Sequence, residues 1–416
     1  MAFCVSLKQV IGGGVVALTG PAIAATGSGA ALSYGLAALV VLLVSLPYAV
    51  LGAARPASGS LYRWPARFIS PSAGFLAFWM VLGTHVGLGA YALTFGEAVH
   101  LFWPFLPPVA TGAGALLAVL ALNLSGATAT ARTGIVVTAG TVLSLIAFVA
   151  FGLPHLEPRR LLPLLPHGVG AMLGTAAMLS FPLTGATLVS ELSGEMRRPG
   201  RDVPIAILGA TAAAALIYVA VTLVAAALPS AGRSLADSAA EVMPPPVLAL
   251  FELGAGVVSM LGIINAHMMW GSRSILTVCQ DNWLPRRFAR LNRAGAPVWP
   301  LCLLAAIGLV PLLGGLDIAS AIRVSGLGAG GSAILSVLCA ALFARREPKA
   351  LVASPLPVRP VPLSAACALA IAGQVAIIGL LCRDLAPALV GGWIAWMAIG
   401  AALAGWRRRG VTVRFG

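Results

Sequence analysis

The chain has 416 residues, of which 59% are apolar and only 9% are charged. A soluble protein carries about a quarter charged residues. This composition, with a mean hydropathy of +0.98, therefore excludes a soluble enzyme, a disordered protein and an ordinary nucleic-acid binder. The net charge of +14 then indicates positively charged cytoplasmic loops, because membrane proteins retain Lys and Arg on that side of the membrane.

Charge-free apolar stretches long enough to cross a bilayer, about 20 residues each, recur along the whole chain. The connections between them are too short to form a soluble domain. We therefore predict an all-α membrane protein with about twelve transmembrane helices embedded in the lipid bilayer. The predicted spans are 9–27, 30–54, 73–104, 107–125, 133–153, 169–190, 203–228, 245–272, 298–315, 319–343, 361–381 and 386–405.

The basic residues fall mostly in alternate connections. If the N-terminus is cytoplasmic, most of the 26 Lys and Arg residues lie in the cytoplasmic segments, including those near 55–67, 197–201, 286–293, 345–359 and 407–414. This asymmetry predicts a multi-pass protein of the inner (plasma) membrane with both termini in the cytoplasm.

Two of the spans contain residues that interrupt a helix. The first has Ile11 followed by Gly12-Gly13-Gly14, and each glycine costs a helix interior about 1 kcal/mol relative to alanine. The sixth has the segment 180–185, Ser-Phe-Pro-Leu-Thr-Gly, in which Pro182 removes a backbone donor. Each has an ordinary alternative: a close helix–helix contact for the glycines and a proline kink for the second segment.

The two interruptions occupy matching positions if the first ten helices are two repeats of five. A pair of broken helices at matching positions predicts an inverted-repeat secondary transporter. The half-helix N-termini of such a protein bind an anionic group such as a carboxylate, and freed carbonyls accept hydrogen bonds from an ammonium. This recognition suits a chain with few acids in its spans.

Four segments, in order along the chain, resemble the amino acid/polyamine/organocation (APC) superfamily of transporters, and its amino acid permeases in particular. They cover residues 10–41, 56–79, 181–207 and 265–300. The third ends in the pattern E-x-x-x-P-x-R-D-[IV]-P, at Glu195, Pro199, Arg201, Asp202 and Pro204.

The resemblance implies a LeuT-type fold and alternating-access transport of amino acids or related amines. One membrane domain would contain two inverted repeats, residues 1–154 and 166–344, and two peripheral helices within 361–406. The substrate would be a small molecule, bound by the backbone of the first broken helix and by residues of the second. These candidate substrate-binding residues are Ile11, Gly12, Gly13, Gly14, Val15, Phe181, Pro182, Leu183, Thr184 and Gly185.

The candidates for ion coupling follow from the spans and from the resemblance. Many family members carry a lysine in the fifth helix, at the position of Thr141 in this chain. The hydroxyl of Thr141 would either help Ser259 to bind a sodium ion or have no part in ion coupling. His85, in the middle of the third span, is a candidate proton carrier, and its alternative is a neutral core histidine bonded to a carbonyl. No cofactor is expected apart from a coupling proton or sodium ion.

Charged residues near the span ends are candidates for gating. Glu195, Arg201 and Asp202 are expected to form a cytoplasmic charge network that braces the closed state. Arg323 would close an outer gate by pairing with Glu97 or Asp317, or else would reach the membrane interface as a snorkelling side chain.

We therefore predict a secondary transporter of neutral amino acids, small or apolar ones, since few acids are available to bind a polycation. An amine or polyamine transporter, exchanger or exporter of the same fold is the alternative. A membrane-embedded enzyme and a channel are disfavoured because no catalytic constellation and no continuous polar stripe is present. Six scattered cysteines predict neither a disulfide framework nor a metal site. The sequence does not predict the oligomeric state or the direction of transport.

Overall fold

The computed structural model describes residues 2–126, 128–408, 411 and 413, and the side chains of residues 2, 5, 13 and 128–136 lie outside this description. Nine stretches of the described chain are long and apolar enough to cross a membrane. The first of them, Ser6–Ala54, contains two of the predicted spans, and two shorter apolar helices, Pro108–Leu124 and Val298–Leu313, account for the others. Every predicted span therefore has its helix, and the all-α membrane class is confirmed.

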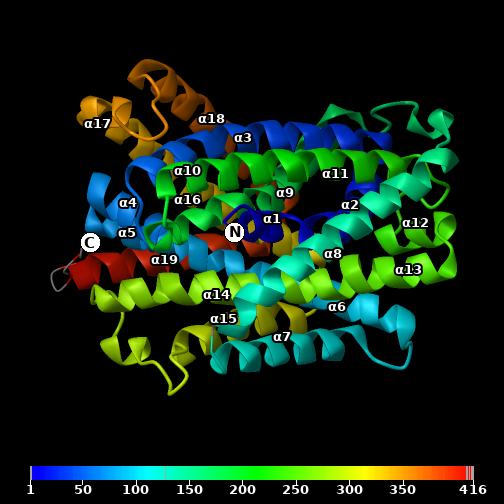
Figure 1. Cartoon of the computed structure of the whole chain (residues 1–416), viewed down its shortest axis with the longest axis horizontal. Helices are drawn as coiled ribbons and strands as arrows, with labels where there is room; N and C mark the ends of the chain where they lie inside the picture. Colours follow the sequence, from blue (N-terminus) through cyan, green and yellow to red (C-terminus); the bar gives the residue numbers. More distant parts are fainter. Residues whose placement is uncertain (1, 127, 409–410, 412, 414–416) are drawn as a thin grey trace.

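The helices run along one common direction, which is the long axis of the molecule in Figure 1. The first half of the described chain contains α1 (Ala2–Val10), α2 (Gly13–Thr26), α3 (Ala30–Ala54), α4 (Ser60–Phe68), α5 (Pro71–Gly83), α6 (Gly87–Phe102), α7 (Pro108–Leu124) and α8 (Thr128–Gly152). The second half contains α9 (Gly168–Leu183), α10 (Pro199–Pro204), α11 (Ala210–Ala226), α12 (Leu235–Val242), α13 (Pro245–Phe251), α14 (Ser259–Gln280), α15 (Val298–Leu313), α16 (Ile318–Arg346), α17 (Pro348–Val352), α18 (Pro360–Asp384) and α19 (Pro387–Arg407).

Several spans change helix type along their length. A 3-10 turn, η2 (Thr84–Val86), joins α5 to α6, and a longer 3-10 segment, η5 (Thr184–Glu191), continues α9. Two segments are π-helical, η7 (Ile205–Gly209) before α11 and η8 (Glu252–Val258) between α13 and α14. Such interruptions of the regular hydrogen-bond ladder are frequent at functional sites.

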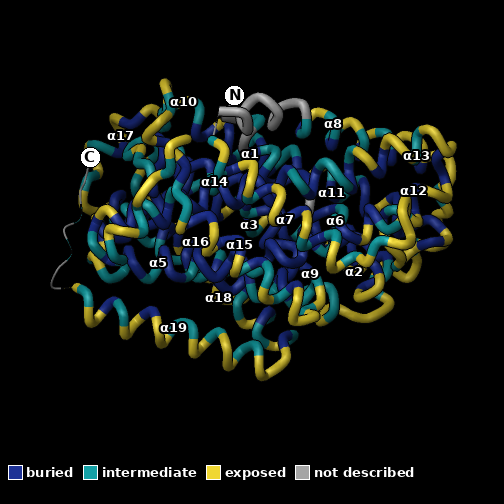
Figure 2. The backbone as a smooth tube through the Cα atoms, turned by 90° about the horizontal axis from the view of Figure 1, so that it is seen from below, coloured by how far each residue is buried: buried dark blue, intermediate teal, exposed yellow. Residues whose placement is uncertain are grey.

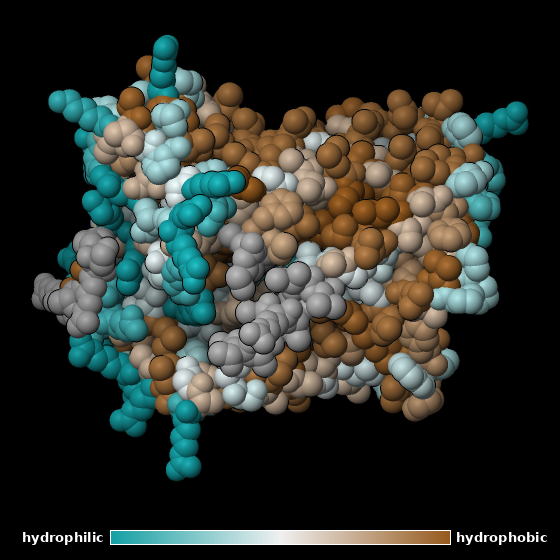
Figure 3. Space-filling model, in the orientation of Figure 1, coloured by the Kyte–Doolittle hydropathy of each residue, from teal (hydrophilic) through white to brown (hydrophobic). Residues whose placement is uncertain are grey.

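On the face seen in Figure 3, hydrophobic side chains form a broad belt between two hydrophilic ends. We call them the basic end, where α4, α10 and α17 lie, and the α12 end, where α12 and the start of α13 lie (Figure 1). The interior of the bundle is buried, whereas α19 lies at its edge and is largely exposed along its length (Figure 2). The belt is the surface expected to contact lipid.

Candidate functional site

The first predicted break is present, and it is narrower than the glycine run. Helix α1 ends at Val10 and α2 begins at Gly13, so only Ile11 and Gly12 lie outside the helices. Gly12 has a φ of 154°, which a residue with a side chain rarely adopts. Gly13 and Gly14 already belong to the first turn of α2, and no side chain caps that turn. The first N–H groups of α2 therefore lack a side-chain partner.

Two buried tyrosines donate to backbone carbonyls on either side of the break. The hydroxyl of Tyr218, on α11, donates to the carbonyl of Val10, and that of Tyr34, on α3, donates to the carbonyl of Gly14 over 3.3 Å. The two tyrosine rings contact each other edge to face, with centroids 5.4 Å apart. The break is thus held open by specific side chains from two other helices.

The second predicted break is a change of helix type that starts just after the proline. Helix α9 continues through Pro182 to Leu183, and the chain then follows 3-10 geometry from Thr184 to Glu191. The hydroxyl of Thr184 donates to the carbonyl of Phe181 over 2.6 Å, and that of Thr187 donates to the carbonyl of Thr184 over 2.7 Å. Side-chain hydroxyls thus add hydrogen bonds to the backbone carbonyls where the α-helix changes to 3-10 geometry.

The two interrupted segments contact each other directly. A Cβ atom added at Gly14 would lie 2.3 Å from the Cβ of Pro182, and one added at Gly185 would lie 2.4 Å from the carbonyl oxygen of Gln9. Ser6 also donates to the carbonyl of Ala186 over 3.3 Å, which joins α1 to η5. Only glycine permits this approach of the two backbones.

A cavity of about 40 Å³ lies beside this contact. Four of the sequence-predicted residues line it, namely Phe181, Pro182, Thr184 and Gly185, whereas Leu183 and residues 11–15 do not. Polar and aromatic side chains from five other helices also line the cavity. Among them are Gln9, Tyr48, Tyr91, His267, Trp270 and Ser332.

Some polar groups of the wall have no hydrogen-bond partner within the described protein. They are both amide atoms of Gln9, Nδ1 of His267 and Nε1 of Trp270, and all three residues are buried. Buried polar atoms are normally paired, since an unmade hydrogen bond costs about 1–3 kcal/mol. These groups are available to a ligand that enters the cavity.

His85 lies behind this wall. Its Nδ1 is 3.2 Å from the carbonyl oxygens of Val81 and Leu82, so this nitrogen carries the proton, and Nε2 has no described partner. The ring packs against Trp270 and His267, with centroids 4.7 Å and 5.7 Å away. The bonds from His85 to carbonyl oxygens are those expected of a neutral core histidine. The contact between the His85 and His267 rings places a second imidazole beside the first.

Thr141 and Ser259 both contact the π-helical segment η8. The Thr141 hydroxyl lies 2.9 Å from the carbonyl of Val137 in its own helix and 3.3 Å from that of Gly254, and Ser259 donates to the carbonyl of Ala255. Gly12 packs against Ser259, since a Cβ there would lie 3.6 Å from the serine Cβ. Lys8 lies near the same helix, since its Cε is 3.2 Å from the Cβ position of Gly262, three residues after Ser259.

The expected cytoplasmic network is wrong in its partners. Glu195 pairs with Arg273, at the basic end, over 3.1 Å, and no ion pair among the described residues joins Arg201 to Glu195 or to Asp202. The loop after η5 turns Glu195 toward α14, whereas Arg201 and Asp202 lie in α10, which packs against α3.

Arg323 forms no ion pair among the described residues, so the expected pairs with Glu97 and Asp317 are absent from this structure. Asp317 instead caps α16, because its carboxylate accepts the N–H of Ser320 over 2.9 Å. Glu97 lies in another cavity, at the α12 end.

A helical membrane bundle with two interrupted helices meeting at a small internal cavity defines the class of secondary transporters. Residues 2–388 match the model of the family described as "Amino acid permease". The chain belongs to this amino acid permease family of the APC superfamily, and it is a transporter, not an enzyme.

Curated relatives agree with this assignment. An uncharacterized transporter of Mycobacterium tuberculosis (strain ATCC 25618 / H37Rv) is 32% identical over 300 residues, which cover 70% of this chain and 67% of that protein. The methylthioribose transporter of Bacillus subtilis (strain 168) is 27% identical, with 68% and 67% covered. The branched-chain amino acid permease BcaP of the same bacterium is 23% identical, with 69% and 67% covered.

Proposed function

We propose that this permease carries neutral amino acids, small or apolar ones, across the cytoplasmic membrane by alternating access. The observation that carries the proposal is the contact of the two interrupted helices, Gly14 against Pro182, beside a buried cavity. Two five-helix inverted repeats, residues 1–154 and 166–344, would place these interruptions at matching positions, with the helices of 361–406 at the periphery.

The cavity and the break supply complementary chemistry for a zwitterion. The uncapped first turn of α2 offers N–H groups and the positive end of a helix dipole to a carboxylate. The amide of Gln9 has both its atoms free for the ammonium or the carboxylate. No Asp, Glu, Lys or Arg side chain is among the described residues that line the cavity, so a second charge on the substrate would stay unpaired.

Transport requires a change of shape at the centre. A volume of about 40 Å³ holds only a few water molecules, since one needs about 10–15 Å³ by this measure. Phe181 and Thr184 would therefore move outward to admit an amino acid. We assign the basic end to the cytoplasm, because positive loops are retained there.

For the driving ion we favour a proton at the imidazole pair of His85 and His267 over a sodium ion at Thr141 and Ser259. Both hydroxyls already donate to carbonyls, whereas each imidazole has an unpartnered nitrogen. The groups that face the pair are Trp270 and Tyr91, so no described charged side chain contacts it. We expect His85→Gln to flatten the pH dependence of uptake; an unchanged profile would make His85 a packing residue.

Uptake into proteoliposomes tests the proposed function. Purified protein should accumulate labelled L-leucine or L-alanine under an imposed proton gradient, and putrescine should not compete. Accumulation driven only by a sodium gradient would contradict the coupling assignment. Uptake of putrescine in place of neutral amino acids would contradict the substrate class.

A further inference from the structure

A second and larger cavity, of about 530 Å³, opens at the α12 end of the molecule. One side is the outer half of α2, with Val16, Ala17 and Gly20, and the other is formed by α6 and by the π-helical segment η8. The segment that leads into α12 covers part of it. We call this cavity the vestibule. It is more than large enough for one amino acid, whereas the central cavity is not.

The vestibule gathers charges that have no partner in the described protein. Glu97 of α6 and Glu252 of η8 line it together with Arg233, and none of the three takes part in an ion pair or a side-chain hydrogen bond between described residues. Other acids at this end are engaged. Asp237 forms the capping box of α12 with Ser234.

Glu252 is the most informative of these residues. It is only 6% exposed, and its Oε1 is buried without any hydrogen-bond partner. Its other oxygen lies 3.1 Å from the Cβ position of Gly256, which also lines the vestibule, so the carboxylate lies along the cavity wall. A buried carboxylate without a partner is costly, and a cationic group in the vestibule would supply the missing interaction.

The vestibule leads toward the break in the first span. Gly256 lines its floor, and Ser259, three residues further along the same span, packs against Gly12. At about 1.5 Å per residue, Glu252 lies roughly 10 Å along the helix from this contact. A molecule held at Glu252 is therefore close to the N-terminus of α2 and has not yet entered the central cavity.

We propose that the vestibule is a second substrate site, which binds an amino acid zwitterion before it reaches the centre. Glu252 accepts hydrogen bonds from the ammonium group, Glu97 adds a second negative charge at the exposed rim, and Arg233 pairs with the carboxylate. The site rests on the proposed function, because it takes the same substrate class. It differs from the central cavity in using charged side chains where the centre uses backbone and neutral groups.

Equilibrium binding of labelled L-leucine to the full-length protein in detergent tests the vestibule site. We expect two leucines per wild-type protein and one per Glu252→Gln variant, with at least tenfold weaker binding at the lost site. Glu157→Gln is the matched control, because Glu157 lies at the same end but pairs with Arg160 and does not line the vestibule. Glu252→Asp, which retains the charge, should keep the second site and shows whether the position tolerates change.

Competitors identify the group that Glu252 holds. Propylammonium chloride should displace only the vestibule leucine, and sodium chloride at the same ionic strength should not. Equal displacement by sodium would overturn the assignment to an ammonium group. One leucine per wild-type protein with normal uptake would overturn the vestibule site alone, whereas absence of both binding and uptake would overturn the proposed function with it.

Discussion

Three donors converge on the carboxylate of Glu191, at the end of η5. The backbone N–H of Leu61 lies 2.6 Å away, the hydroxyl of Ser274 lies 2.5 Å away, and the hydroxyl of Ser60 lies 3.2 Å away. The residue is 2% exposed, so these bonds replace its hydration. Through it, the second interrupted span is bonded both to α4 and to α14.

Replacing Glu191 by Gln should therefore destabilise the folded protein. The amide loses the charge that strengthens these bonds and presents an NH₂ group to donors, at a cost of about 1–3 kcal/mol. Thermal unfolding in detergent measures the change, and Glu157→Gln, at an exposed position, provides the control. Equal unfolding temperatures for the two variants would contradict the anchoring role.

How much of the site could be predicted differs from residue to residue. The interruptions at Gly12 and Pro182 could be found, because glycine and proline act on the local backbone. Gln9 and Trp270 could not, since their place in the cavity wall depends on how α1 and α14 are rotated about their axes in the bundle. Glu191 was missed for the same reason: its three donors come from residues 60, 61 and 274, which only the fold brings together.

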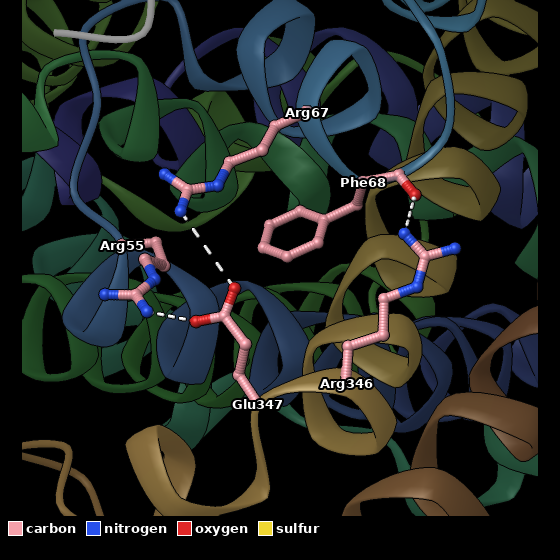
Figure 4. Close-up of polar contacts among 5 residues, drawn as sticks. All are labelled: Arg55, Arg67, Phe68, Arg346 and Glu347. Carbon is pink, nitrogen blue, oxygen red and sulfur yellow. Dashed lines mark hydrogen bonds and ion pairs between the residues drawn. The ribbon is translucent and has the colours of Figure 1, made fainter.

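At the scale of elements, the basic end is closed by contacts among three helix ends. Glu347, just after α16, pairs with Arg55 at the end of α3 and lies 4.0 Å from Arg67 of α4 (Figure 4). Arg346 donates to the carbonyl of Phe68 over 2.8 Å. The pattern of spans predicted α3 and α16 but not the short helix α4, and it did not predict this pairing, because Arg55 and Glu347 lie nearly 300 residues apart in the chain.

We expect Glu347→Gln to increase access from the basic end to the central cavity while lowering the stability of the folded protein only slightly. The Arg55–Glu347 pair is partly exposed, with side-chain exposures of 34% and 28%, so its loss should cost at most about 1 kcal/mol. A cysteine in place of Leu188, which lines the central cavity, should react faster with a charged thiol reagent in this variant. The charge-swapped pair Arg55→Glu with Glu347→Arg should restore slow labelling. Equal labelling rates in all three backgrounds would show that the ion pair does not control access.

At the scale of the whole molecule, the hydrophobic belt and the two polar ends define how the protein sits in a bilayer (Figure 3). The described C-terminal residues and α17 lie at the basic end, and α12 lies at the opposite end (Figure 1). Composition predicted the class, and the charge-free apolar stretches predicted the number of spans, because crossing a bilayer fixes both the length and the polarity of each helix.

The excess of positive charge at the basic end predicts the orientation of the protein in the membrane. A green fluorescent protein fused to the C-terminus should fluoresce, and alkaline phosphatase inserted at 229–234, before α12, should be active, because it would lie outside the cytoplasm. The opposite pair of results would reverse the orientation and would place the vestibule on the cytoplasmic side.

The central claim is that the substrate binds where the two interrupted helices meet. Uptake of labelled L-leucine by the Gly14→Val variant tests it most directly, because the added Cβ would overlap Pro182 at 2.3 Å. A clash that costs this packed arrangement about 1.4 kcal/mol or more lowers its population at least tenfold. Gly35→Ala, with no atom near the added Cβ, is the control. The account predicts that Gly14→Val inserts and purifies normally but transports less than about a tenth of the wild-type amount, with Gly35→Ala unchanged; near-normal uptake by Gly14→Val would contradict it.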